Sequence, residues 1–207
     1  MNKLKLQDLK EHFFTLYPKG FEDDGLQQIV KRHNTVKIGE TVKEMFSPEN
    51  FAQREIICEN FSKIVSKSSL ISLFEKPKVR DMVKSMSMEQ KDIFSIGLYE
   101  LIHGRQKLGF ETLVEVLAFY KLAKWSLVTL IPYYYAREKE IFIKPTTTKD
   151  IIKFFEIENL IYKPKPSFDF YKKYKKIIFD LKKDVKELRN KDNAGFTGFL
   201  MIGMKDK

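Results

Sequence analysis

The helical character of the chain is clearest in residues 167–190, SFDFYKKYKKIIFDLKKDVKELRN. Apolar residues recur there at spacings of three and four, which places them on one face of an α-helix. They are Tyr171, Tyr174, Ile178, Leu181, Val185 and Leu188. Lysines occupy the opposite positions. The stretch therefore predicts a long amphipathic helix from about Ser167 to Asn190 with a basic outer face.

Helix signals extend along the rest of the chain. Ser87 and Gln90 have the spacing of a capping box, which marks the start of a helix, and the same spacing recurs at Thr147 and Asp150. Only residues 140–145 have the character of a short extended piece, because residues before a proline avoid the α region. The sequence therefore predicts a mainly α fold of roughly eight to ten helices, with at most a minor β-hairpin.

The length of 207 residues fits one compact domain or two small lobes. Gly104 follows an apolar helical pattern and is predicted to end that helix. If lobes exist, we expect an N-terminal helical lobe over residues 1–104 and a C-terminal helical lobe over 105–207, which contains the basic long helix.

Several features predict a cytoplasmic protein. The N-terminal residues become charged too soon for a signal peptide. The uncharged run 125–136 is far shorter than the roughly 20 residues that a membrane span needs, so we interpret it as a buried helix. The single cysteine, Cys58, excludes an internal disulfide and agrees with a reducing compartment.

The formal net charge of +10 and the pI of about 9.4 favour attraction to nucleic acid, an anionic membrane surface or an acidic protein. Charge alone does not choose among these partners. A lysine- and phenylalanine-rich composition of the kind that AT-rich genomes encode accounts for the same charge without any partner.

The common signatures of enzymes are missing. His12, His33 and His103 lie far apart in the sequence, so no metal site is predicted. Cys58 falls on the apolar stripe of its helix, where an inert core thiol is the usual outcome. The phosphate-binding, dinucleotide-binding and nucleophile-elbow motifs are absent as well. We therefore predict no cofactor and favour a binding protein over an enzyme.

The most suggestive polar stretch is residues 142–149, FIKPTTTK. Its hydroxyls and lysines surround the first turn of a predicted helix, where free backbone N–H groups attract anions. The candidate residues are Lys144, Thr146, Thr147, Thr148 and Lys149. Helix capping by Thr147 is the structural alternative for one of the three hydroxyls.

Two further cations are candidates for the same anion site. Arg80 lies in a charged segment where an ion pair with Glu75 is the structural alternative. Lys124 precedes the apolar run 125–136, so its ammonium must reach solvent, a carboxylate or a bound anion.

The outer face of the long helix is a candidate nucleic-acid surface. Its lysines can contact phosphates, and nearby tyrosines at 133–135 and 162 can supply stacking surfaces if they are exposed. The lysines are Lys172, Lys173, Lys175, Lys176, Lys182 and Lys183. A plain solvated helix face is the structural alternative.

Five segments of the chain resemble, in the same order, those of an uncharacterised bacterial protein family. They are Gly20-Phe21-Glu22-Asp23, Phe74-Glu75-Lys76 with Arg80-Asp81, the stretch from Gly97 to Gly104 (GLYELIHG), Lys124-Trp125, and residues 142–148 (FIKPTTT). The resemblance spans nearly the whole chain. It implies a bacterial source and one shared architecture, and it carries over no activity, ligand or catalytic residue.

Three functions follow as hypotheses. The first is a basic intracellular protein that binds nucleic acid through phosphate contacts. The second is an enzyme or receptor for a small anionic ligand, which requires Arg80, Lys124, Lys144 and the threonines to converge on one cavity. The third is a helical adaptor in a protein complex, for which an acidic protein is a natural partner.

Overall fold

The structure is a computed structural model that describes residue 2 and residues 4–204. Within these residues the chain forms eleven α-helices and three short 3₁₀ turns, and no strand. The prediction of a mainly α fold is confirmed, with one helix beyond the upper end of the roughly eight to ten expected.

The α-helices are α1 (Leu4–Leu16), α2 (Asp24–His33), α3 (Thr35–Met45), α4 (Arg54–Lys67), α5 (Glu75–Ser85), α6 (Met88–His103), α7 (Gln106–Phe119), α8 (Trp125–Tyr135), α9 (Pro145–Phe154), α10 (Phe168–Lys183) and α11 (Asn193–Gly203). The 3₁₀ turns are η1 (Gly20–Glu22), η2 (Pro48–Ala52) and η3 (Lys186–Leu188).

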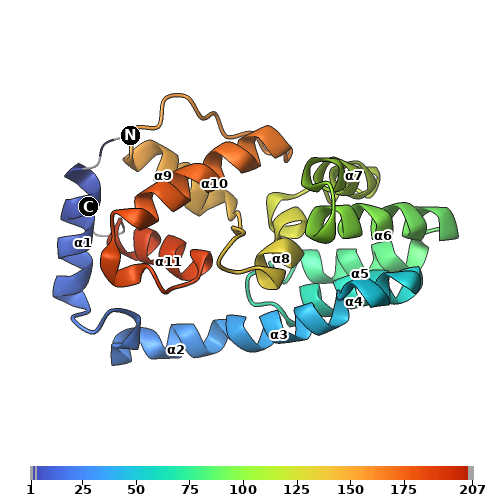
Figure 1. The fold of residues 1–207 in the computed structure, drawn as a ribbon, viewed down its shortest axis with the longest axis horizontal. Coiled ribbons are helices and arrows are strands. Elements are labelled where there is room, and N and C mark those ends of the chain that lie inside the picture. Colours follow the sequence, from blue (N-terminus) through green and yellow to red (C-terminus); the bar gives the residue numbers. More distant parts are fainter. Residues whose placement is uncertain (1, 3, 205–207) are drawn as a thin grey trace.

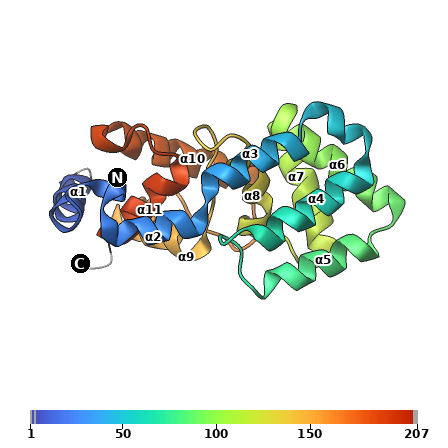
Figure 2. The ribbon, with the colours of Figure 1, turned by 90° about the horizontal axis from the view of Figure 1, so that it is seen from below.

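The molecule is elongated, with α1, α9, α10 and α11 at one end and α4 to α7 at the other (Figure 1). Helices α2 and α3 follow one another along an edge and connect the two ends, while α8 lies between them. The turned view shows the same division, with α1 far from α5 and α7 (Figure 2). The functional site is built where the α2–α3 edge meets the end formed by α9 and α11.

Helix α8 is the central element of the core. Every residue from Trp125 to Tyr134 is buried, and the helix contacts α3, α4, α6 and α7. The prediction that the uncharged run is a buried helix is confirmed. Pro132, which the sequence predicts to kink or end this helix, lies in its last turn, where the helix ends at Tyr135.

Helices α6 and α7 pack at very short range because glycines leave room for the backbone. A Cβ atom on Gly109 would lie 2.1 Å from the backbone nitrogen of Leu101 and 2.5 Å from the carbonyl oxygen of Gly97. The predicted lobe boundary near Gly104 falls in the short connection between these two helices. The division into lobes stays a prediction.

Helix α11 returns the end of the chain to its beginning. Phe199 packs edge-on against Phe13 with ring centroids 4.9 Å apart, so α11 covers α1. The sequence predicts only that residues 196–204 pack back on the body of the protein, because that tail is apolar. The arrangement fixes α11 as one wall of the cavity described below.

The predicted long basic helix is wrong in its C-terminal third. Helix α10 ends at Lys183, Val185 leaves the helical region with φ −112° and ψ 85°, and a separate 3₁₀ turn follows. Val185 and Leu188 stay buried across this break. The reversal returns the chain toward α11, so core packing and chain topology override the helical periodicity of the segment.

Residues 140–144 are extended but pair with no strand in the described part of the chain. The Ile143 backbone N–H instead donates to the Thr129 hydroxyl at 3.1 Å, which anchors the segment on α8. No helix among the described residues combines the length and apolarity needed to cross a bilayer.

Candidate functional site

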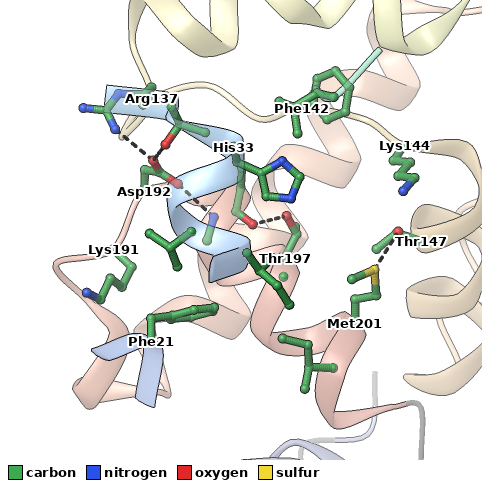
Figure 3. A pocket seen from close by; sticks show the side chains of 18 of the residues that line it. Phe21, His33, Arg137, Phe142, Lys144, Thr147, Lys191, Asp192, Thr197 and Met201 are labelled. Atoms are coloured by element: carbon green, nitrogen blue, oxygen red, sulfur yellow. Dashed lines mark hydrogen bonds and ion pairs between the residues drawn. The ribbon is translucent and has the colours of Figure 1, made fainter. Parts of the chain in front are cut away.

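A cavity of about 550 Å³ lies between the α2–α3 junction, the first turn of α9 and helix α11 (Figure 3). Its apolar lining includes Phe21, Ile29, Val30, Val36, Leu70, Phe142, Met201 and Ile202. Its polar lining includes Gln27, His33, Thr35, Arg137, Lys144, Thr147, Thr148, Tyr174, Asp192 and Thr197. A mostly apolar hollow of this size with a few polar groups is typical of a small-molecule site.

The outer wall of the cavity is apolar and uncovered. Ile29, Val30 and Val36 come from α2 and α3, and each remains about half exposed. Helix α2 ends at His33, and the next residue, Asn34, adopts a left-handed conformation with φ 45° and ψ 38°. Asparagine tolerates this conformation better than most residues. The turn at Asn34 separates α2 from α3, and the residues on either side of it, His33 and Thr35, line the cavity.

His33 is the last residue of α2 and faces the start of α9 (Figure 3). Its Nδ1 lies 2.8 Å from the hydroxyl of Ser69, in the connection between α4 and α5. Burial lowers the pKa of His33, and the positive charges of Arg32 and Lys144 lower it further. The imidazole is therefore neutral at pH 7 and offers a ring nitrogen for hydrogen bonding.

Lys144 lies on the opposite wall, at the N-terminal end of α9 (Figure 3). It is the N-cap residue and provides no side-chain cap, and the next residue is Pro145. The Thr148 N–H bonds to the Lys144 carbonyl, so the N–H groups of Thr146 and Thr147 have no partner inside the helix. Among the described residues no carboxylate pairs with the Lys144 ammonium.

Thr147 does not cap α9, contrary to the prediction. Because Pro145 takes the first helical position, Thr147 falls on the third, and its hydroxyl donates to the Met201 sulfur at 3.7 Å. This contact joins α9 to α11 across one side of the cavity (Figure 3). Thr148 is buried and lies close enough to the Tyr174 hydroxyl to act on its pKa.

Four of the other charged residues at the cavity pair within the protein, whereas the lining carboxylate of Glu138 forms no ion pair with a described residue. Arg137 lies 3.0 Å from the carboxylate of Asp192, whose other oxygen accepts the Gly195 N–H at 2.8 Å and caps α11. Thr35 donates to the same carboxylate at 3.4 Å. The Lys191 ammonium lies 3.8 Å from Glu22. Lys144 thus remains the lining cation for which the described residues supply no counter-charge.

The structure separates the predicted anion-binding residues into two groups. Lys144, which is exposed, and the buried Thr147 and Thr148 line the cavity, whereas the exposed Thr146 and Lys149 do not. The Lys149 ammonium lies 6.0 Å from the centre of the Tyr162 ring.

Arg80 and Lys124 lie elsewhere and do not join the cavity. Arg80 is exposed on α5, with its Nε 3.9 Å from Asp81. Lys124 reaches a carboxylate, since its ammonium lies 2.9 Å from Glu75. The predicted pairing of Glu75 with Arg80 is therefore replaced by a pairing with Lys124.

The six lysines of α10 also fall into different environments. Lys175 pairs with Glu140 at 2.8 Å and Lys183 with Asp180 at 3.2 Å. Lys182 donates to the Lys191 carbonyl and to Asn193, and burial lowers its pKa. The other three are exposed and form no ion pair with a described residue: Lys172, Lys173 and Lys176.

Sequence reasoning missed the apolar walls and His33. The segment 33–35 reads only as a polar break between two helical patterns, although Asn34 is a signal for a left-handed turn. No residue near His33 in the sequence indicates that its side chain lies close to Ser69 and Lys144, because both are distant in sequence. The described residues hold no group of three or more metal-ligating side chains.

Comparisons with family models, curated proteins and solved structures gave no match to this chain.

Proposed function

We propose that the protein binds a small amphipathic anion, a molecule with an apolar body and a carboxylate or phosphate head, in the cavity between α2, α9 and α11. One observation supports this above the others. A lysine without a counter-charge among the described residues, Lys144, faces a hollow whose outer wall is apolar and half exposed.

The polar end of the cavity suits an anion. The Lys144 ammonium, the unbonded N–H groups at the start of α9 and a neutral His33 are all donors or potential donors. Charge-assisted hydrogen bonds of this kind are about twice as strong as neutral ones. The helix dipole of α9 adds to the attraction because its positive end lies at the same place.

The apolar end suits a hydrocarbon or aromatic body. Ile29, Val30 and Val36 are partly in water, so a ligand that covers them removes apolar surface from solvent. A ligand that consists of a head group alone would leave this wall uncovered. A ligand with an apolar body and no charge would leave Lys144 without a partner. The ligand that fits both ends is therefore amphipathic.

Titration calorimetry with a panel of probes tests the proposal. Decanoate, decyl phosphate, decanol and acetate separate the contributions of body and head group. We expect saturable binding of the two decyl anions, weaker binding of decanol and none of acetate. Decanol binding as tightly as decanoate, or no binding by any decyl compound, would contradict the proposal.

A matched pair of variants locates the site. Val30→Trp fills the outer wall of the cavity, whereas Ile93→Trp places the same side chain at a similarly exposed position on α6. We expect Val30→Trp to weaken decanoate binding and Ile93→Trp to leave it unchanged.

A second candidate function is nucleic-acid binding by α10. The observation that favours it is the set of three exposed lysines without carboxylate partners among the described residues, Lys172, Lys173 and Lys176. Phosphate contacts of this kind predict binding that weakens linearly with the logarithm of salt concentration. Replacing these three by Gln is expected to reduce the salt slope, whereas Lys175→Gln, which removes a paired lysine, is not.

A further inference from the structure

Four of the most exposed large apolar side chains belong to three segments that meet at the start of α8. Leu73 is 78% exposed, Phe74 83%, Phe119 74% and Ile161 77%. Leu73 and Phe74 immediately precede α5, Phe119 ends α7, and Ile161 lies in the connection between α9 and α10. Isolated exposed apolar residues need no explanation, but several on segments that are joined to one another point to an interaction surface.

An ion pair and two hydrogen bonds hold the three segments together at this junction. The Glu75 carboxylate, next to Phe74, pairs with Lys124 at 2.9 Å and accepts the Ser126 hydroxyl at 3.3 Å. The Trp125 indole N–H donates to the Lys163 carbonyl at 2.8 Å, which attaches the segment containing Ile161. The connection from Phe119 leads directly into Lys124.

The same segments are strongly basic. Residues 73–78, 119–124 and 161–165 contain six lysines and one acidic residue, Glu75. The lysines are Lys76, Lys78, Lys121, Lys124, Lys163 and Lys165. Lys124 pairs with Glu75, and the other five form no ion pair with a described residue. We call these lysines and the four apolar residues the junction surface.

We infer that the junction surface docks on an anionic lipid bilayer, with its apolar side chains inserted among the head groups and its lysines on the lipid phosphates. Apolar side chains combined with lysines are the pattern of interfacial membrane binding. Lysine stems can also cover apolar surface while their ammonium groups stay in the head-group layer. This inference is independent of the cavity.

The chemistry of the surface favours lipid over other polyanions. Phe74 and Phe119 have flat rings, but Leu73 and Ile161, which make up the other half of the apolar set, are aliphatic and offer no face on which a nucleic-acid base can stack. The apolar groups come from two interhelical connections and one helix end, so they form no continuous helix or sheet face for a protein partner. A bilayer interface accepts separate apolar side chains without a complementary shape.

Vesicle sedimentation with the full chain tests the inference. The probes are phosphatidylcholine vesicles and vesicles in which about one third of the lipid is phosphatidylserine. We expect binding to the second only, and weaker binding at high salt because screening shortens the reach of the lysines. Failure to bind the anionic vesicles at low salt would overturn the inference.

Matched variants separate insertion from plain charge attraction. Leu73→Ser with Phe74→Ser is expected to weaken vesicle binding by roughly tenfold or more, because two apolar side chains are lost from the interface. Leu4→Ser is the control, since Leu4 is also 78% exposed but lies on α1, far from α5 and α7 (Figures 1 and 2). Equal binding by wild type and the double variant would also overturn the inference.

The lysines are tested in the same assay. Lys163→Gln with Lys165→Gln is expected to weaken binding several-fold, because each lysine near an anionic surface contributes to the attraction. Lys37→Gln with Lys43→Gln removes the same charge from α3, outside the junction surface, and is expected to have the smaller effect. If the two pairs weaken binding equally, net charge alone explains the attraction and the inference is wrong.

Discussion

The guanidinium of Arg137 lies 3.0 Å from the carboxylate of Asp192, and the same carboxylate caps helix α11. Both side chains are largely buried. Asp192 therefore supports the cavity wall both by pairing with Arg137 and by capping α11. We expect Asp192→Ala to destabilise the protein by about 2 kcal/mol, through the lost cap and the unpaired arginine.

Denaturant unfolding measures this effect, and Asp180→Ala is its control. Asp180 pairs with Lys183 on the surface, where an ion pair contributes little, so we expect a change within about 0.5 kcal/mol. Equal losses in the two variants would contradict the role given to Asp192.

The close approach of α6 and α7 makes Gly109 sensitive to substitution. An added methyl group would overlap the backbone of α6, with Leu101 nitrogen only 2.1 Å away, so the helices must separate. We expect Gly109→Ala to cost about 3 kcal/mol of unfolding free energy. Gly198→Ala on α11 meets its nearest neighbour at 3.9 Å and is expected to be neutral or slightly stabilising. Thermal unfolding of both variants checks the contrast.

Removing the hydroxyl groups of Tyr133 and Tyr134, which are adjacent on α8, is expected to change the free energy of unfolding by different amounts. The buried Tyr134 hydroxyl lies 2.9 Å from the Ser68 hydroxyl, so Tyr134→Phe should cost about 1 kcal/mol. The Tyr133 hydroxyl is buried without hydrogen-bonding geometry to a described residue, although Thr35 lies close enough to act on its pKa. Tyr133→Phe should therefore be neutral or stabilising. Denaturant unfolding that shows a larger loss for Tyr133→Phe would contradict this assignment.

Stability at mildly acid pH depends on His33. Its pKa in the folded protein is lowered from the ordinary value of 6.5 by burial and by Arg32 and Lys144, so the unfolded chain takes up its proton first as pH falls. The contribution of His33 to stability is constant above about pH 6.5 and is lost as pH drops below that value. Unfolding curves from pH 7 to pH 5 should show a steeper loss in wild type than in His33→Gln.

Local features of the fold could be predicted from the sequence. The capping box of Ser87 and Gln90 is present as expected, because both partners lie within one turn. The prediction that Thr147 caps α9 is wrong. Proline is frequent at the first helical position, so Pro145 was the better indicator of where this helix begins. The basic helix was predicted too long, because the break after Lys183 depends on where the chain must meet α11.

The candidate site could be predicted only in part. Lys144, Thr147 and Thr148 were identified because they surround one helix start, which is a local property. Arg80 and Lys124 were grouped with them by charge alone, and the structure places them elsewhere. His33 reaches the cavity through a tertiary arrangement that no spacing along the chain encodes.

The affinity of decanoate for wild type, Lys144→Gln and Lys149→Gln tests the proposed ligand class most directly. Both lysines are exposed, one just before α9 and one in its middle, but Lys144 lines the cavity and Lys149 does not, so the variants remove the same charge from nearby positions. We predict that Lys144→Gln weakens binding by about tenfold, because it removes a charge-assisted contact, and that Lys149→Gln changes it little. Equal affinities of all three proteins, or equal losses in the two variants, would contradict the account.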